Sequence, residues 1–189
     1  GTVYGNQVEQ PIKETAVPVP INHYGNLKLC IENTIRTFNF QMKKNMLVAR
    51  ISNPYGPGQD YHKGVGFIDA AIKRSLHHET IEIWGDGNII RDYIFIDDVC
   101  KMLYSLIDYH GDIEVFNLSS NTGTSQNDVI NILNKIIPHV QVKYLPARPV
   151  DAKKIVLDNT RIQSICNLQM VSLEDGIRRY YDYIQQRKQ

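Results

Sequence analysis

The spacing of apolar and polar residues changes from loop to helix to strand along the first third of the chain. Residues 6–23 are polar and contain three prolines, which predicts a loop. Apolar residues recur at a helical period from 24 to about 43, and a short apolar run over 46–51 predicts a buried strand. Two prolines and two glycines in residues 53–58 predict a turn. The helical period is set by Leu27, Cys30, Ile31, Ile35 and Phe38.

The remainder of the chain alternates in the same way. Helical patterns cover residues 65–77, 97–109, 125–137, 159–166 and 173–185. Strand-like runs cover residues 81–84, 92–96, 115–118 and 140–145, and a Pro-containing basic loop follows over 146–154. Asp97 is predicted to be the N-cap of its helix. Strands that alternate with helices predict an α/β protein built on a parallel sheet.

Composition narrows the class of protein. The chain has 189 residues, of which 42% are hydrophobic and 22% charged, so it can bury a sizeable core. The net charge is +1 without a long run of like charge, which argues against nucleic-acid partners and a polybasic membrane surface. Cys30, Cys100 and Cys166 are scattered and odd in number, and the first two are predicted to be small core residues. A reducing, cytoplasmic setting fits this usage.

Tyr24 and Lys28 are the first candidates for chemistry, because their spacing puts a phenol and an ammonium group on one helix face, about 6 Å apart along the axis. A phenol's ordinary pKa of about 10 must fall to about 7 for it to act as a base near neutral pH, a change worth roughly 4 kcal/mol. A cation at ~4 Å in a partly shielded site supplies about that much. This pattern alone is more often an ordinary surface pair, so the flanking motifs decide its interpretation.

Further polar residues suit a phosphate-bearing ligand. Asn53 follows a predicted strand, where ligands bind in open α/β sheets, although an Asn there is equally typical of a turn. Arg91 follows a tight turn, and Arg148 lies three residues before Asp151. Two arginines and a carboxylate would suit a diphosphate and a ribose diol, whereas either arginine alone is more often a surface ion pair. The histidines and cysteines form no metal-binding motif, so no metal is expected.

Motifs that recur in a fixed order add a family resemblance. They are GTVYG (1–5), YGNLK (24–28), RISNPYGP (50–57), WGDGNIIRDYIFIDDV (84–99), RPVD (148–151) and SLEDGI (172–177). Together they resemble the extended short-chain dehydrogenase/reductases that act on nucleotide sugars, the NAD-dependent epimerase/dehydratase family. The resemblance covers essentially the whole chain.

The resemblance implies a fold and a division of the chain. It implies the C-terminal part of a Rossmann-type parallel sheet plus a smaller mixed α/β substrate-binding domain. Residues 1–52 and 91–122 would belong to the cofactor sheet, and 53–90 and most of 123–189 to the substrate domain. No G-x-G-x-x-G phosphate loop occurs in the sequence. We therefore expect a fragment of a longer enzyme, one that binds NAD poorly and is inactive by itself.

The resemblance also implies roles for individual residues. Tyr24 would be the catalytic base and acid, Lys28 would hold the nicotinamide ribose of NAD and favour the ionised phenol, and Ile51 would border the cofactor. Thr2 occupies a further catalytic position. The nucleotide-diphosphate sugar would be bound by Asn53, Trp84, Arg91, Arg148 and Asp151.

The residues at the start of the chain distinguish among family members. Gly1 and Thr2 stand where the related 4,6-dehydratases have Asp-Glu, and neither residue can transfer a proton as a carboxylate does. The expected reaction is therefore epimerisation at C4 of a nucleotide sugar, with the full-length parent forming a homodimer. Two alternatives stay open: an NAD(P)H-dependent reductase of nucleotide-4-ketosugars, and an inactive nucleotide-sugar-binding module.

Overall fold

The computed structural model describes residues 1–59, 66–147 and 152–187. The helices in these ranges are α1 (His23–Met42), α2 (Phe67–Leu76), α3 (Ile96–Ser105), α4 (Gln126–Ile136), α5 (Thr160–Cys166) and α6 (Leu173–Gln186). The strands are β1 (Val48–Ile51), β2 (Asn53–Tyr55), β3 (Ile81–Trp84), β4 (Ile90–Phe95), β5 (Val115–Leu118), β6 (Gly123–Ser125), β7 (Val142–Leu145) and β8 (Lys154–Ile155).

Most strand pairs are parallel, so the α/β prediction is confirmed. β1 pairs with β5 from Val48 opposite Val115 to Ile51 opposite Leu118. β4 is the central strand of a second sheet, with parallel neighbours β2 and β8 and the antiparallel neighbour β6. β3 and β7 form a separate parallel pair. Parallel pairs need crossover connections, which the intervening helices provide.

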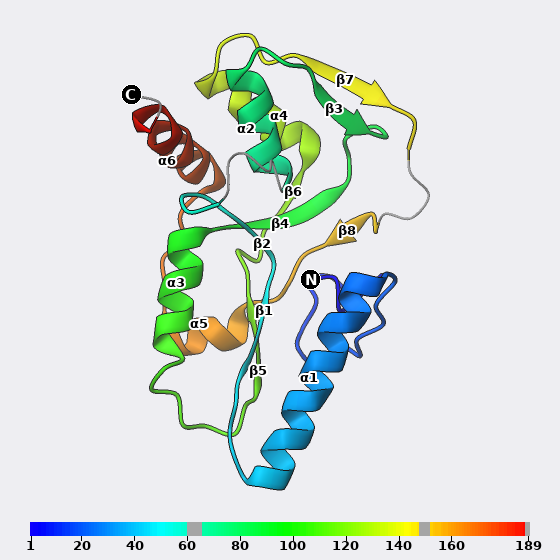
Figure 1. The fold of residues 1–189 in the computed structure, drawn as a ribbon, viewed down its shortest axis with the longest axis vertical. Helices are drawn as coiled ribbons and strands as arrows, with labels where there is room; N and C mark the ends of the chain where they lie inside the picture. The colour runs from blue at the N-terminus through cyan, green and yellow to red at the C-terminus, as the bar shows by residue number, and fades with distance from the viewer. Residues whose placement is uncertain (60–65, 148–151, 188–189) are drawn as a thin grey trace.

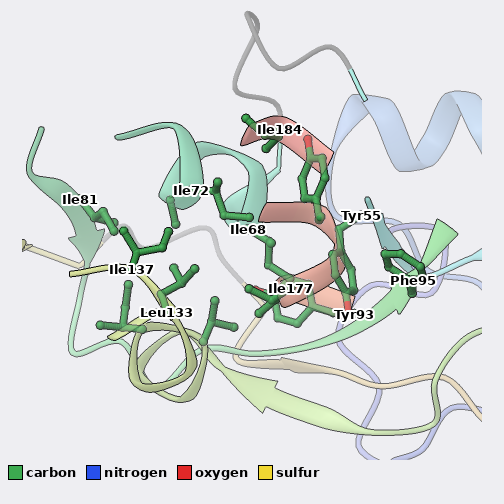
Figure 2. Close-up of a cluster of buried hydrophobic side chains, with 14 of the residues drawn as sticks. Tyr55, Ile68, Ile72, Ile81, Tyr93, Phe95, Leu133, Ile137, Ile177 and Ile184 are labelled. Atoms are coloured by element: carbon green, nitrogen blue, oxygen red, sulfur yellow. The ribbon is translucent and has the colours of Figure 1, made fainter. Parts of the chain in front are cut away.

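The helices cover the strands on both sides (Figure 1). α1 lies on one side of the β1–β5 pair, and α3 and α5 lie on the other. α2, α4 and α6 gather with β3 and β7 at the opposite end of the molecule. Figure 2 shows the largest apolar cluster there, in which Ile68 and Ile72 of α2 meet Leu133 of α4 and Ile177 of α6. A second cluster, which includes Met102 of α3, fills the space between α3, β5 and α5.

The helix ends follow from local sequence. The side chain of Asn22 accepts a hydrogen bond from the Gly25 amide at 2.8 Å and so caps α1. Ser125 and Asp128 form a reciprocal capping box at the start of α4. Asp97, by contrast, is not an N-cap as predicted. α3 begins at Ile96 with Phe95 as its cap, because β4 runs directly into the helix and leaves Asp97 within its first turn.

Three short strands lie in segments predicted otherwise. The first half of the predicted turn at 53–58 is a strand, because residues 53–55 pair with β4. The chain turns only after residue 55. β6 and β8 were not predicted, since segments of three and two residues carry no readable period. β8 begins at the end of the predicted loop 146–154.

The buried side of α1 differs from the one that its apolar period predicts. Its buried residues are Gly25, Glu32 and Asn39, whereas Leu27 and Ile31 are exposed. The prediction that two cysteines are core residues is also wrong, because Cys30 and Cys100 are exposed.

The proposed division of the chain at residues 52, 90 and 122 stays a prediction. The two apolar clusters follow it in part, although Ile162 of α5 packs in the cluster with β5. Among the described residues, none of the helices combines the length and apolar character that a membrane crossing requires.

Candidate functional site

A cavity of about 800 Å³ opens between α1, the N-terminal segment and the carboxyl end of β1. Six of the predicted site residues line it: Thr2, Tyr24, Lys28, Ile51, Asn53 and Arg91. Trp84 does not line this cavity. Arg148 and Asp151 lie outside the described residues. The fold therefore brings together residues that are up to 89 positions apart in the sequence, from Thr2 to Arg91.

The first turns of α1 place Tyr24 and Lys28 on the cavity wall. The ammonium nitrogen of Lys28 lies 5.2 Å from the centre of the Tyr24 ring, and the Tyr24 side chain is 61% exposed. Gly25 lets the segment that carries Thr2 approach the helix, because a Cβ at Gly25 would lie 2.5 Å from the Thr2 carbonyl oxygen. The phenol, the ammonium group and Thr2 thus share one end of the cavity.

Asn53 and Arg91 come from the neighbouring strands β2 and β4 and line the same cavity. The Asn53 amide donates to the Asp92 carbonyl at 2.8 Å, which ties β2 to β4. The Arg91 guanidinium donates to the Ala152 carbonyl at 2.8 Å and to the Ile90 carbonyl at 2.9 Å. A half-buried guanidinium beside an amide is suited to a diphosphate.

A smaller cavity of about 220 Å³ adjoins the large cavity and extends to α2. It shares Asn53, Arg91 and three other lining residues with the large cavity and adds aromatic walls from Tyr55, Phe67 and Tyr93. Burial raises the pKa of Tyr93 to about 12 and that of Tyr55 further, so both phenols are neutral. None of the three was predicted as a site residue, although Tyr55 and Tyr93 lie within the motifs at 50–57 and 84–99.

A buried ion pair forms part of the wall beneath Lys28. The Arg50 guanidinium donates to both Glu32 carboxylate oxygens, at 3.0 and 2.7 Å, and to the Tyr4 hydroxyl at 2.7 Å. Burial by itself lowers the pKa of Arg50, but hydrogen bonds to Glu32 and Tyr4 outweigh it and raise the pKa. The Tyr4 hydroxyl in turn donates to Asn117 on β5 at 2.7 Å. None of these contacts was predicted from the sequence.

Metal ligands do not gather in the part of the chain that the structure describes. Its His, Cys, Asp and Glu side chains form no group of three or more that could hold a metal ion. The cavity presents a phenol, an ammonium group, guanidinium groups, amides and the carboxylate of Glu32, which is paired with Arg50.

Comparison with known proteins relates this geometry to a family. The model of the NAD dependent epimerase/dehydratase family matches residues 1–119. The fold is similar to a crystal structure of UDP-glucose 4-epimerase with UDP-glucose from Thermotoga maritima, with a TM-score of 0.92 and 33% identity over 100% of this chain. It is also similar to UDP-glucuronic acid 4-epimerase from Bacillus cereus with UDP-glucuronic acid and NAD, with a TM-score of 0.89 and 27% identity over 98% of this chain.

A reductase is similar as well. The dTDP-4-dehydro-6-deoxyglucose reductase of Escherichia coli is 28% identical over 94% of this chain. The alignments cover 62% of the Thermotoga protein, 59% of the Bacillus protein and 56% of the reductase. The chain therefore spans about three fifths of the length of these three proteins.

Proposed function

The chain belongs to the NAD-dependent epimerase/dehydratase family, and on this premise we propose that its protein is a nucleotide-sugar 4-epimerase. The observation that carries the proposal is one cavity lined both by Tyr24 and Lys28 and by Asn53 and Arg91. Groups suited to proton transfer and groups suited to phosphate binding therefore face the same open space. Relatives in this family include nucleotide-sugar epimerases, reductases and dehydratases.

Tyr24 removes the proton from the C4 hydroxyl of the sugar in this proposal, and it returns the proton after the 4-keto intermediate has rotated. Lys28 lies beside the Tyr24 ring and binds ribose hydroxyls through its ammonium hydrogens. NAD, when bound, supplies the reversible hydride acceptor. The residues present fit its nicotinamide-ribose end, because exposed Tyr24 and Lys28 and the strand end at Ile51 all line the cavity. They include no glycine-rich loop for its phosphates.

Asn53 and Arg91 hold the substrate's diphosphate, with Arg148 and Asp151 as further proposed ligands and Trp84 beside the nucleobase. Thr2 lines the cavity without a carboxylate, which supports epimerisation over water elimination. A reductase of nucleotide-4-ketosugars is the second candidate function, because the reductase of Escherichia coli is 28% identical to this chain, against 27% for the Bacillus cereus epimerase. A homodimer through α1 stays a prediction.

Tyr24→Phe tests the proposal in the protein as its gene encodes it. We expect UDP-glucose to be converted to its C4 epimer with only catalytic NAD, and the variant to lose roughly 10²–10⁴-fold in kcat. Binding of UDP, measured by calorimetry, stays unchanged because the phenol is at the other end of the cavity. Lys135→Met, which removes an exposed ion pair between α4 and α6, is the control. Stoichiometric consumption of NADPH with a 4-ketosugar would identify the reductase instead.

A further inference from the structure

The buried side of α1 makes polar contacts with the rest of the protein. Its three buried residues are Gly25, Glu32 and Asn39, which are seven residues apart and therefore lie on one stripe of the helix. Gly25 packs against the Thr2 carbonyl, and the Asn39 amide donates to the Met46 carbonyl at 2.9 Å. None of the three buries a large apolar side chain. Hydrogen bonds at Glu32 and Asn39 therefore contribute to the position of α1.

The middle contact, between Glu32 and Arg50, has the strictest geometry. The guanidinium meets the carboxylate through two hydrogen bonds, and the two side chains are only 4% and 8% exposed. Such a planar, two-point pairing fixes orientation as well as distance. Tyr4 and Asn117 extend it to the N-terminal segment and β5. Four segments of the protein thus meet at Arg50.

This contact lies next to the proposed chemistry. Tyr24, Lys28 and Glu32 follow one another at four-residue steps, so they share a face of α1. Arg50 directly precedes Ile51, and Lys28, Glu32, Arg50 and Ile51 all line the same cavity. The pair therefore joins the helical turn after Lys28 to the strand end beside the cofactor position.

We propose that Glu32 and Arg50 are positioning residues, which set Tyr24 and Lys28 at the distance from the end of β1 that proton transfer requires. The inference rests on the proposed function. An apolar contact at this point could slide along the helix, whereas the two-point ion pair admits one register. Glu32 and Arg50 touch neither substrate nor cofactor in this role, and they act through the placement of α1.

Two variants separate positioning from stability. Glu32→Gln keeps the shape but removes the charge, and Arg50→Lys keeps the charge but removes the planar fork. Each is compared with Lys135→Met, which removes the exposed Lys135–Glu174 pair at 2.9 Å. Kinetics are measured on the protein as its gene encodes it, with kcat expressed per UDP-binding site counted by calorimetry. We expect kcat to fall roughly 10- to 100-fold in both variants while KM for the nucleotide sugar changes little.

NMR provides a readout that does not depend on turnover. We expect the backbone amide signals of Tyr24 and Lys28 to shift in Glu32→Gln and Arg50→Lys and to stay in place in Lys135→Met. Unmoved amides, or a kcat per site equal to that of the wild type, would overturn the positioning role. If the amides shift but the wild-type protein does not epimerise, the positioning of α1 stands and the proposed function fails.

Discussion

Asp92 shows how much one buried side chain organises near the cavity. It is fully buried, and its carboxylate accepts four hydrogen bonds. The donors are the Ser52 hydroxyl, the Ser120 amide and hydroxyl, and the Leu157 amide, at 2.8–3.2 Å. Three segments distant in sequence are thus tied to β4 one residue after Arg91. Only a carboxylate can accept from so many donors at once.

Asp92→Asn is therefore expected to destabilise the protein although it preserves shape. The amide group offers a single acceptor oxygen and brings an NH2 against donors that are themselves buried. Leaving such donors unpaired costs about 1–3 kcal/mol, which urea unfolding measures directly. Asp108→Asn, on an exposed side chain, is the matched control. Equal midpoints for the two variants would contradict this account of Asp92.

The same carboxylate predicts a pH dependence of stability. Burial raises the pKa of Asp92, although hydrogen bonds from Ser120, Leu157 and Ser52 oppose the change. Between the unfolded value of about 3.9 and the higher folded value, the native state binds more protons. The proton-linked part of the contribution of Asp92 to stability is thus complete below the unfolded pKa and is lost as pH rises through the folded pKa, whereas its hydrogen bonds remain. The stability difference between wild type and Asp92→Asn should shrink as pH rises across this window in urea titrations. A difference that widened would contradict the raised pKa.

At the scale of elements, periodicity identified the long helices. Which side of a helix is buried and where short strands form depend instead on hydrogen-bond partners elsewhere in the chain. α1 was predicted within one residue at each end, but its buried face was not, since Glu32 reads as a surface residue until Arg50 is placed beside it. β2 contains Pro54, which looks like a turn residue. Pro54 is exposed and β2 has β4 as its one neighbour among the described strands, a place where proline is tolerated.

The candidate site was predictable where a residue follows a strand or a tight turn. Asn53 was expected at the site because it follows a predicted strand, where ligands bind in open α/β sheets, and Arg91 because it follows a tight turn and its guanidinium suits a phosphate. Glu32 and Tyr4 carry no such signal, since their importance arises from contacts across more than 15 residues of sequence. Short-range patterns locate elements, whereas buried polar networks depend on which elements meet.

Gly25→Ala tests how closely α1 approaches the N-terminal segment. Alanine favours a helix over glycine by about 1 kcal/mol, so the exchange would stabilise an unconstrained helix. Here the added Cβ would lie 2.5 Å from the Thr2 carbonyl oxygen and 3.0 Å from the Pro20 Cβ. Such overpacking costs typically about 1–3 kcal/mol, so we expect a net loss in thermal unfolding. Asn26→Ala, at the adjacent exposed position, should be neutral or stabilising. A stabilised Gly25→Ala would show that the segment moves freely away from α1.

For the molecule as a whole, β4 lies between the two apolar clusters. Tyr93 and Phe95 point into the cluster with α2, α4 and α6, whereas Ile94 points into the cluster with α3 and β5. This follows from the alternation of side chains along a strand. The polar groups proposed to bind the diphosphate, Asn53 and Arg91, lie on β2 and β4 at this junction. A ligand that binds both should therefore stabilise both clusters together.

Ligand-induced stabilisation separates the two halves of the proposed site. UDP should bind residues 1–189, because Asn53 and Arg91 belong to this chain, and at 100 times its Kd it should add about 2.7 kcal/mol. For a domain of this size that raises Tm by roughly 5–10 °C, in one cooperative transition if the clusters respond together. NAD at the same concentration should raise Tm much less, because the sequence holds Tyr24 and Lys28 but no glycine-rich loop for the cofactor's phosphates.

Arg91→Ala should abolish the rise in Tm that UDP causes. A large shift with NAD and none with UDP would reverse the assignment of the cavity's two ends, because the phosphate-binding groups would then serve the cofactor.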